Sequence, residues 1–197
     1  MHARVRPIGE RLRGSGSRWG PIAQAFHWIS ALLVVGLLVV GFVMTRWRFD
    51  LATTFELYQA HKSYGLLALM LVLARLAWRG FDQVPAPPAS MRPLERRLAR
   101  IVHAALYVLL VALPVSGWLM ASASPLRLPT RPFNLFAMPD LVPPGPVLFA
   151  RLRLLHVILS DLLVAALALH VAGALKHHFR DRDDVLRRML PARHSRD

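Results

Sequence analysis

The sequence predicts an all-α membrane protein, a bundle of four antiparallel transmembrane helices with both termini in the cytoplasm. The chain of 197 residues is 55% hydrophobic and only 18% charged, and its mean hydropathy is +0.40. Four apolar stretches are long enough to cross a bilayer. The basic residues gather in alternate connections between these stretches. This composition is typical of a small membrane protein and unusual for a water-soluble domain of the same length.

The four predicted spans are 26–45, 60–78, 101–121 and 154–175. Each should be a helix, because backbone polar groups in lipid must be satisfied within the segment. The second span carries Lys62 and Arg75 near its two ends, where both side chains are long enough to reach the membrane interfaces. Pro114 lies inside the third span and is expected to kink it. Short first and second connections favour antiparallel packing of neighbours.

The orientation follows from the Lys and Arg residues. The N-terminal tail (1–18) holds five, the second connection (79–100) five and the C-terminal segment (176–197) seven. The first connection (46–59) holds two and the third (122–153) four. The positive-inside rule therefore places both termini and the second connection in the cytoplasm. The net charge of +14 is accounted for by this topology, so no nucleic-acid partner is expected.

The segments outside the spans suggest one domain with two tails. We expect a cytoplasmic tail at 1–18, a transmembrane domain at 19–180 and a second cytoplasmic tail at 181–197. The first tail lacks the apolar core of a secretory signal, so the first span is expected to be retained. Leu94–Arg100 is expected to form a short separate helix at the interface. The 122–153 connection contains seven prolines and is expected to cap one face of the bundle.

Histidines lie at two depths within the predicted spans. His27 and His170 fall near the cytoplasmic face, whereas His61 and His156 fall near the outer face. His156 and His170 are fourteen positions apart. This spacing separates them by roughly 21 Å along a helix and leaves them within about 40° of each other around it. The pattern predicts two histidine pairs, His27 with His170 and His61 with His156, stacked through the bundle.

Haem is the group that suits such pairs best. The chain has no cysteine, which excludes thiolate-held clusters and thioether-linked haem. A structural zinc ion needs four ligands, whereas a haem needs only two axial ones from the protein. We therefore predict two haems b on His27, His61, His156 and His170. The alternatives are that these histidines make structural hydrogen bonds or form a proton path. Glycines in the spans favour either helix packing or close approach of a macrocycle: Gly41, Gly65, Gly117 and Gly173.

Four stretches carry a family resemblance. They are "FHW", "HKSYGLLALMLVLARLAWR", "HAALYVLLVALPVSGWLM" and "LHVILSDLLVAALALHVAGALKHHFRDRDDVLRRMLP". In this order they resemble the bacterial cytochrome b561 family, over roughly residues 18–191. The resemblance implies a four-helix, di-haem b protein of the bacterial inner membrane, and its haem-ligand positions correspond to the same four histidines. A six-helix eukaryotic cytochrome is excluded by the number of spans. A less close likeness extends to the cytochrome b subunits of hydrogenases and formate dehydrogenases.

The resemblance also implies a choice of functions. Some family members are similar to superoxide oxidase, an oxidoreductase that transfers electrons from superoxide at the outer face to ubiquinone. That activity is the main expectation here, with no catalytic residue assigned beyond the haem ligands. The alternative is a transfer subunit that links the quinone pool to a separate, periplasmic redox protein. A proton or metal transporter without haem is a third hypothesis, which a colourless folded protein would favour.

Three further residues are candidate propionate or quinone contacts: Lys62, His103 and His177. Lys62 follows a predicted outer ligand, so its charge could also attract superoxide, or it could simply anchor the interface. His103 lies at the cytoplasmic level and could rival His27 or His170 as a ligand. His177 and His178 follow the last apolar turn and could instead be interfacial anchors.

Overall fold

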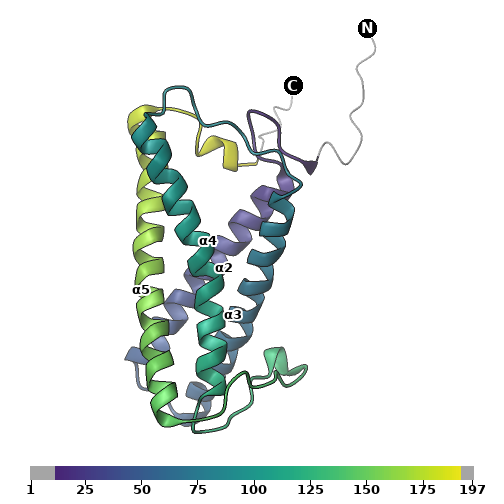
Figure 1. Cartoon of the computed structure of the whole chain (residues 1–197), viewed down its shortest axis with the longest axis vertical. Coiled ribbons are helices and arrows are strands. Elements are labelled where there is room, and N and C mark those ends of the chain that lie inside the picture. The colour runs from purple at the N-terminus through teal and green to yellow at the C-terminus, as the bar shows by residue number, and fades with distance from the viewer. Residues whose placement is uncertain (1–11, 192–197) are drawn as a thin grey trace.

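The computed structural model describes residues 12–191, and four long helices dominate it (Figure 1). They are α2 (Pro21–Arg46), α3 (Leu51–Arg79), α4 (Pro93–Ser122) and α5 (Pro146–Lys176). Three short turns accompany them: η1 (Pro132–Asn134), η2 (His177–Asp181) and η3 (Arg187–Met189). All four long helices have the length and composition needed to cross a membrane, which confirms the predicted all-α bundle. The sidedness of the termini stays a prediction, and residues 1–11 and 192–197 of the expected tails lie outside the described residues.

The helices begin before the predicted spans, because the apolar windows leave out stretches near the helix starts that contain polar or charged residues, such as Thr53, Glu95 and Arg151. Proline occupies the first turn of α2, α4 and α5, where its missing N–H costs no hydrogen bond. α3 instead begins after Asp50, whose carboxylate accepts hydrogen bonds from the amide of Thr53 (3.0 Å) and from its hydroxyl (2.6 Å). These hydrogen bonds hold the pKa of Asp50 below its usual value.

The separate interfacial helix expected at Leu94–Arg100 is wrong. These residues are the first turns of α4, which runs without a break from Pro93 to Ser122 and continues through Pro114. The Glu95 carboxylate accepts a hydrogen bond from the amide of Arg92 (3.1 Å) and so caps the start of the helix. No Gly or Pro separates Glu95 from the apolar stretch, so nothing in the sequence ends the helix there.

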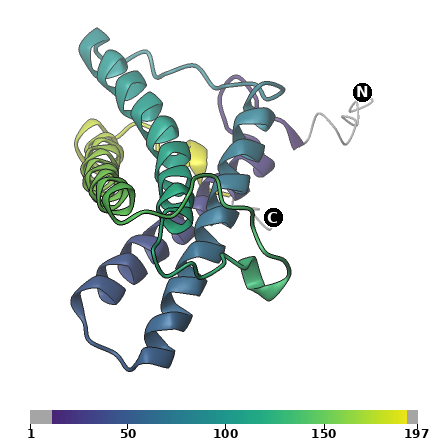
Figure 2. The same ribbon diagram turned by 60° about the horizontal axis from the view of Figure 1, so that its bottom comes forward.

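The helices form two adjacent pairs. α2 packs on α3 and α4 packs on α5, with α3 and α4 joining the pairs (Figures 1 and 2). The buried apolar cluster comes from α2, α4 and α5, and its members are Val34, Leu106, Leu109, Leu163 and Ala166. Many other apolar side chains are exposed, such as Leu32 (75%) and Leu169 (64%). An apolar surface of this kind is appropriate for contact with lipid tails.

Connections close both ends of the bundle. At one end, the α4–α5 connection folds over the helix ends (Figure 2), as expected from its prolines. There the amide of Phe133 donates to the Ser63 hydroxyl (3.1 Å) and the Trp118 indole donates to the carbonyl of Pro139 (3.0 Å). At the other end, the Trp28 indole donates to the carbonyl of Met189 (2.8 Å), which ties the C-terminal segment to α2.

Candidate functional site

Three of the histidines meet at one level of the bundle, near the end where α2 begins and α5 ends (Figure 1). The ring centroids of His27 on α2 and His170 on α5 are 6.1 Å apart, with the rings inclined by 68°. The rings of His103 on α4 and His170 are closer, with centroids 5.2 Å apart. We call these three residues the inner cluster.

The two distances between ring centroids differ in whether a metal ion fits between the imidazoles. A metal–imidazole bond is about 2 Å long, so two imidazoles that share one metal ion have ring centres about 6 Å apart. The 6.1 Å between His27 and His170 matches this requirement, whereas the 5.2 Å between His103 and His170 is shorter. The inner cluster therefore contains one pair with the right spacing and one close neighbour.

Arg75 on α3 completes the inner level. Its guanidinium lies 3.4 Å from Nδ1 of His27 and 5.6 Å from the ring centroid of Tyr107. Arg75 therefore points towards the inner cluster, a contact that the sequence did not suggest. None of the ion pairs among residues 12–191 includes Arg75. An unpaired guanidinium in an apolar bundle favours binding of an anion such as a carboxylate.

His61 and His156 occupy the other level, and each lies against a glycine of a neighbouring helix. A Cβ atom on Gly41 would be 3.3 Å from Cε1 of His61, and one on Gly117 would be 3.1 Å from Cε1 of His156. These glycines make room for the imidazoles themselves, a role that the sequence did not suggest. Gly65 and Gly173 have open space at the Cβ position. No ring contact joins His61 to His156 among the aromatic pairs of the described chain, so this outer pair is more open than the inner cluster.

The outer imidazoles differ in their hydrogen bonds. Nδ1 of His156 lies 2.9 Å from the Ser116 hydroxyl on α4. Nδ1 of His61 is buried and has no hydrogen-bond partner. A buried polar atom without a partner is unusual in a native structure and is typical of a site that binds a further group.

One spacing relates the two levels on every helix, and it could have been found in the sequence. The fourteen-residue step from His156 to His170 on α5 recurs on the other three helices. The steps run from His27 to Gly41, from His61 to Arg75 and from His103 to Gly117. Because this step brings a helix back to nearly the same face about 21 Å further along, it marks which residues line the bundle. This step adds Arg75 as a candidate site residue, and it singles out Gly41 and Gly117 among the four glycines noted in the sequence.

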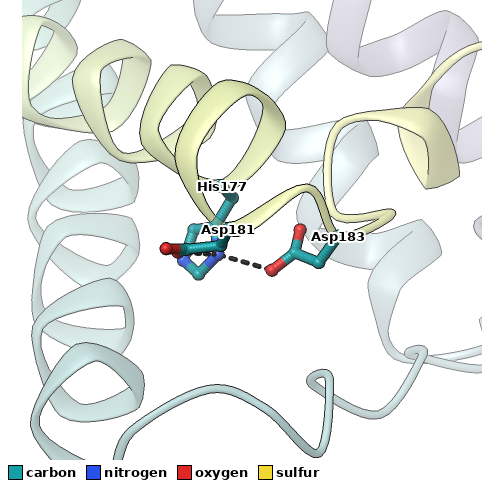
Figure 3. Close-up of side chains that lie close together, drawn as sticks. All are labelled: His177, Asp181 and Asp183. Carbon is teal, nitrogen blue, oxygen red and sulfur yellow. Dashed lines mark hydrogen bonds and ion pairs between the residues drawn. The ribbon is translucent and has the colours of Figure 1, made fainter.

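The remaining candidates lie away from these two levels. Lys62 is half-buried at the end of the bundle where the α4–α5 connection lies. His177 is 8% exposed in the η2 turn, and its Nδ1 lies 2.6 Å from a carboxylate oxygen of Asp183 and 3.1 Å from one of Asp181 (Figure 3). Lys176 also binds Asp181 (2.6 Å) and Glu95 of α4 (2.8 Å). The carboxylates near His177 are therefore already balanced by a cation.

A cavity of about 490 Å³ opens beside this network, between the start of α4 and the end of α5. Its lining includes Arg92, Lys176, His177 and Arg180 together with the carboxylates of Asp181 and Asp183. His178 lies next in the chain, and its Nδ1 is buried without a partner. The cavity offers hydrogen-bond donors and acceptors at the end of α5, seven residues after His170 of the inner cluster.

Comparison with known proteins identifies the family of the chain. The sequence profile of the family "Prokaryotic cytochrome b561" matches residues 18–192. The chain is 36% identical to "Cytochrome b561 homolog 2" of Escherichia coli (strain K12), covering 88% of this chain and 91% of the relative. It is 27% identical to "Cytochrome b561 homolog 1" of the same organism, covering 85% and 93%. It is 26% identical to "Probable superoxide oxidase CybB" of Yersinia pestis, covering 84% and 91%. The chain therefore belongs to the prokaryotic cytochrome b561 family of haem-binding, electron-transferring membrane proteins.

Proposed function

We propose that this chain is a di-haem b cytochrome of the bacterial inner membrane that transfers electrons from superoxide at the outer face to ubiquinone at the cytoplasmic face. The observation that carries the proposal is the arrangement of histidines at two levels, each on facing helices. Two cofactors roughly 21 Å apart along the helices can carry an electron across most of the bilayer, whereas a single cofactor would lie at only one side. The orientation rests on the distribution of Lys and Arg residues.

In this proposal His27 and His170 hold the inner haem, and His61 and His156 hold the outer one. The 6.1 Å spacing of the inner pair, the partnerless Nδ1 of His61 and the clearance at Gly41 and Gly117 support the assignment. When bound, the two haems supply one-electron carriers within the low-dielectric bundle. Arg75 offers a cation for a propionate at the inner level.

The proposed reaction balances in electrons and protons. Two superoxide ions each lose one electron and leave as dioxygen. One ubiquinone gains these two electrons and two protons and leaves as ubiquinol. The chain's residues must therefore admit an anion at one face and supply protons at the other.

Basic side chains at the outer end suit the anionic donor. Lys62 is half-buried beside His61, while Arg151 and Arg153 are exposed at the start of α5. Cationic groups near an opening raise the local concentration of an anion and its rate of encounter. Lys62 is the basic residue next to a proposed ligand and the strongest candidate for this role.

The cavity beside His177 suits the quinone end of the reaction. Its polar lining lies at the membrane boundary, where a quinone head group can enter from the lipid. His177 and its carboxylate partners form a network of close polar contacts beside this cavity. His103, the third member of the inner cluster, is proposed to contact a propionate or the quinone rather than to ligate iron.

The test uses the purified protein in vesicles that contain ubiquinone. The proposal predicts a reduced-minus-oxidised spectrum of haem b, two haems per chain, and ubiquinol formation when superoxide is supplied from outside. His61→Leu should retain one haem and lose superoxide-dependent ubiquinol formation. A colourless folded protein would contradict the proposal and favour a transporter.

A transfer subunit is the second candidate function. Two relatives, 36% and 27% identical, are named only as cytochrome b561 homologs, which specifies no donor. This function predicts a haem protein that ubiquinol reduces, that does not react with superoxide, and that co-purifies with a separate redox protein. Superoxide-dependent ubiquinol formation by the isolated chain would exclude it as the sole activity.

A further inference from the structure

Ser116 on α4 lies where this helix passes the outer histidine of α5. Its side chain is buried, with 3% of the residue exposed. The hydroxyl donates to the carbonyl of Leu113 (2.7 Å) and lies 2.9 Å from Nδ1 of His156. A hydroxyl has a single proton, so the oxygen that donates to Leu113 must accept from His156.

This hydrogen bond favours one tautomer of His156, and the backbone carbonyl of Leu113 is a second acceptor for the ring. With the proton on Nδ1 directed at Ser116, the lone pair of the neutral ring is on Nε2, which is then free to bind a metal. Gly117 adds a steric constraint, since a Cβ atom there would be 3.1 Å from Cε1 of His156 and 3.5 Å from its Nδ1. Two consecutive residues of α4 therefore contribute to the proton position and the ring orientation of His156.

Two of the other histidines assigned to haem, His61 and His27, have different surroundings. Nδ1 of His61 has no partner. Nδ1 of His27 lies 3.4 Å from a guanidinium, which can only donate. Among these three, only His156 has an oxygen acceptor on the nitrogen opposite its proposed ligand atom.

We propose that Ser116 is a positioning residue that sets the reduction potential of the outer haem, an inference that rests on the proposed di-haem function. An acceptor on Nδ1–H makes the imidazole more basic and a stronger donor to the metal. Stronger donation favours the ferric state and lowers the reduction potential. Through this hydrogen bond, Ser116 lowers the reduction potential of the outer haem. A lower potential at the outer haem favours electron flow towards the inner haem.

The experiment compares Ser116→Ala, Ser116→Thr and a matched control, Ser122→Ala. Ser122 is a second buried serine of α4; its hydroxyl donates to the carbonyl of Trp118 and accepts from the amide of Leu141, and it has no hydrogen bond to a histidine of the described residues. Each variant carries His27→Leu as well, so that the outer haem titrates alone in a spectroscopic redox titration. Electron paramagnetic resonance of the ferric haem reports the ligand field independently.

Ser116→Ala should change the ratio of reduced to oxidised haem at fixed potential roughly tenfold towards reduced, which is about 59 mV for one electron. Ser116→Thr should restore the original ratio and the original resonance spectrum, and Ser122→Ala should leave both unchanged. Loss of the outer haem in Ser116→Ala but not in Ser116→Thr would also support the positioning role.

An unchanged titration and resonance spectrum in Ser116→Ala would overturn the inference, as would equal shifts in Ser116→Ala and Ser122→Ala. These outcomes differ from failure of the proposed function. In that case the unsubstituted protein would not bind haem at two sites, and there would be no outer potential to measure.

Discussion

At the scale of single residues, the inner cluster raises the question of which histidines bind iron. His170 has two neighbours, and spacing favours His27 over His103. We predict that His27→Leu and His170→Leu each abolish the inner haem, because a haem b lacking one axial imidazole is weakly held. His103→Leu should retain both haems. The haem-to-protein ratio, measured as the pyridine complex, checks this. Retention of the inner haem in His27→Leu together with its loss in His103→Leu would reverse the assignment.

The second prediction at the residue scale concerns the effect of Arg75 on the reduction potential of the inner haem. A fixed positive charge near a haem stabilises the reduced form, which has one positive charge fewer. Arg75→Leu should therefore lower the inner potential, whereas Arg75→Lys should restore part of it, because the lysine ammonium retains the charge but not the planar fork. Redox titration of the inner haem in a His61→Leu background measures the change. Equal potentials in Arg75→Leu and the parent would show that the guanidinium does not act on the haem.

At the scale of the helices, substitutions of glycines on α2 and α4 test whether these glycines leave room for an outer imidazole or serve only the packing of helices. Gly41→Ala and Gly117→Ala would each place a methyl group within 3.1–3.3 Å of an outer imidazole. Overpacking of this kind costs about 1–3 kcal/mol. We expect both substitutions to weaken or remove the outer haem and to leave the inner one bound, as measured by haem content and by redox titration.

Gly36 provides the matched control on α2. It is exposed, and a Cβ atom there meets nothing within 4 Å. Because alanine is the better helix former, Gly36→Ala should retain both haems and preserve or increase thermal stability. If Gly36→Ala lost the outer haem to the same extent as Gly41→Ala, glycine flexibility rather than clearance would be the requirement.

The helices also show how far the sequence determines the fold. Apolar length predicted all four spans, because the bilayer thickness fixes how many apolar residues a helix needs. The helix starts were predicted too late, since Leu51 and Pro93 begin turns that are polar. Apolar windows detect the lipid-crossing part of a helix and not its capped extension into the interface.

The site was predictable where a residue carries its own chemistry. Imidazoles in apolar spans stand out, so the histidines at both levels were found from depth alone. Gly41, Gly117 and Ser116 act only through a neighbour on another helix, so their roles depend on how the helices rotate against each other. The fourteen-residue step restricts which face points inward, but it does not reveal which helix lies opposite.

At the scale of the whole molecule, charge differs between the two ends of the bundle. The proposed outer end, residues 46–62 and 122–153, has seven basic side chains against three acidic ones. The basic ones are Arg46, Arg48, Lys62, Arg127, Arg131, Arg151 and Arg153. All except Lys62 are exposed, so they create a field in water that salt can screen.

This field leads to a prediction about superoxide. Exposed charges steer an anion mainly through its rate of encounter, an effect that falls with ionic strength because the Debye length is about 10 Å at 0.1 M. Arg151→Glu combined with Arg153→Glu should lower kcat/KM for superoxide several-fold at low salt. The difference from the parent should largely disappear near 1 M salt, where the Debye length is about 3 Å.

The control reverses two charges at the other end of the bundle. Arg96 and Arg97 are exposed on the first turns of α4, so Arg96→Glu with Arg97→Glu changes the net charge by the same amount. If local steering operates, this control has little effect on kcat/KM for superoxide at any salt concentration. Equal losses in both double variants would indicate that net charge alone matters. A loss in the Arg151 and Arg153 variant that persists at high salt would instead indicate direct contact with superoxide or a change in the outer haem.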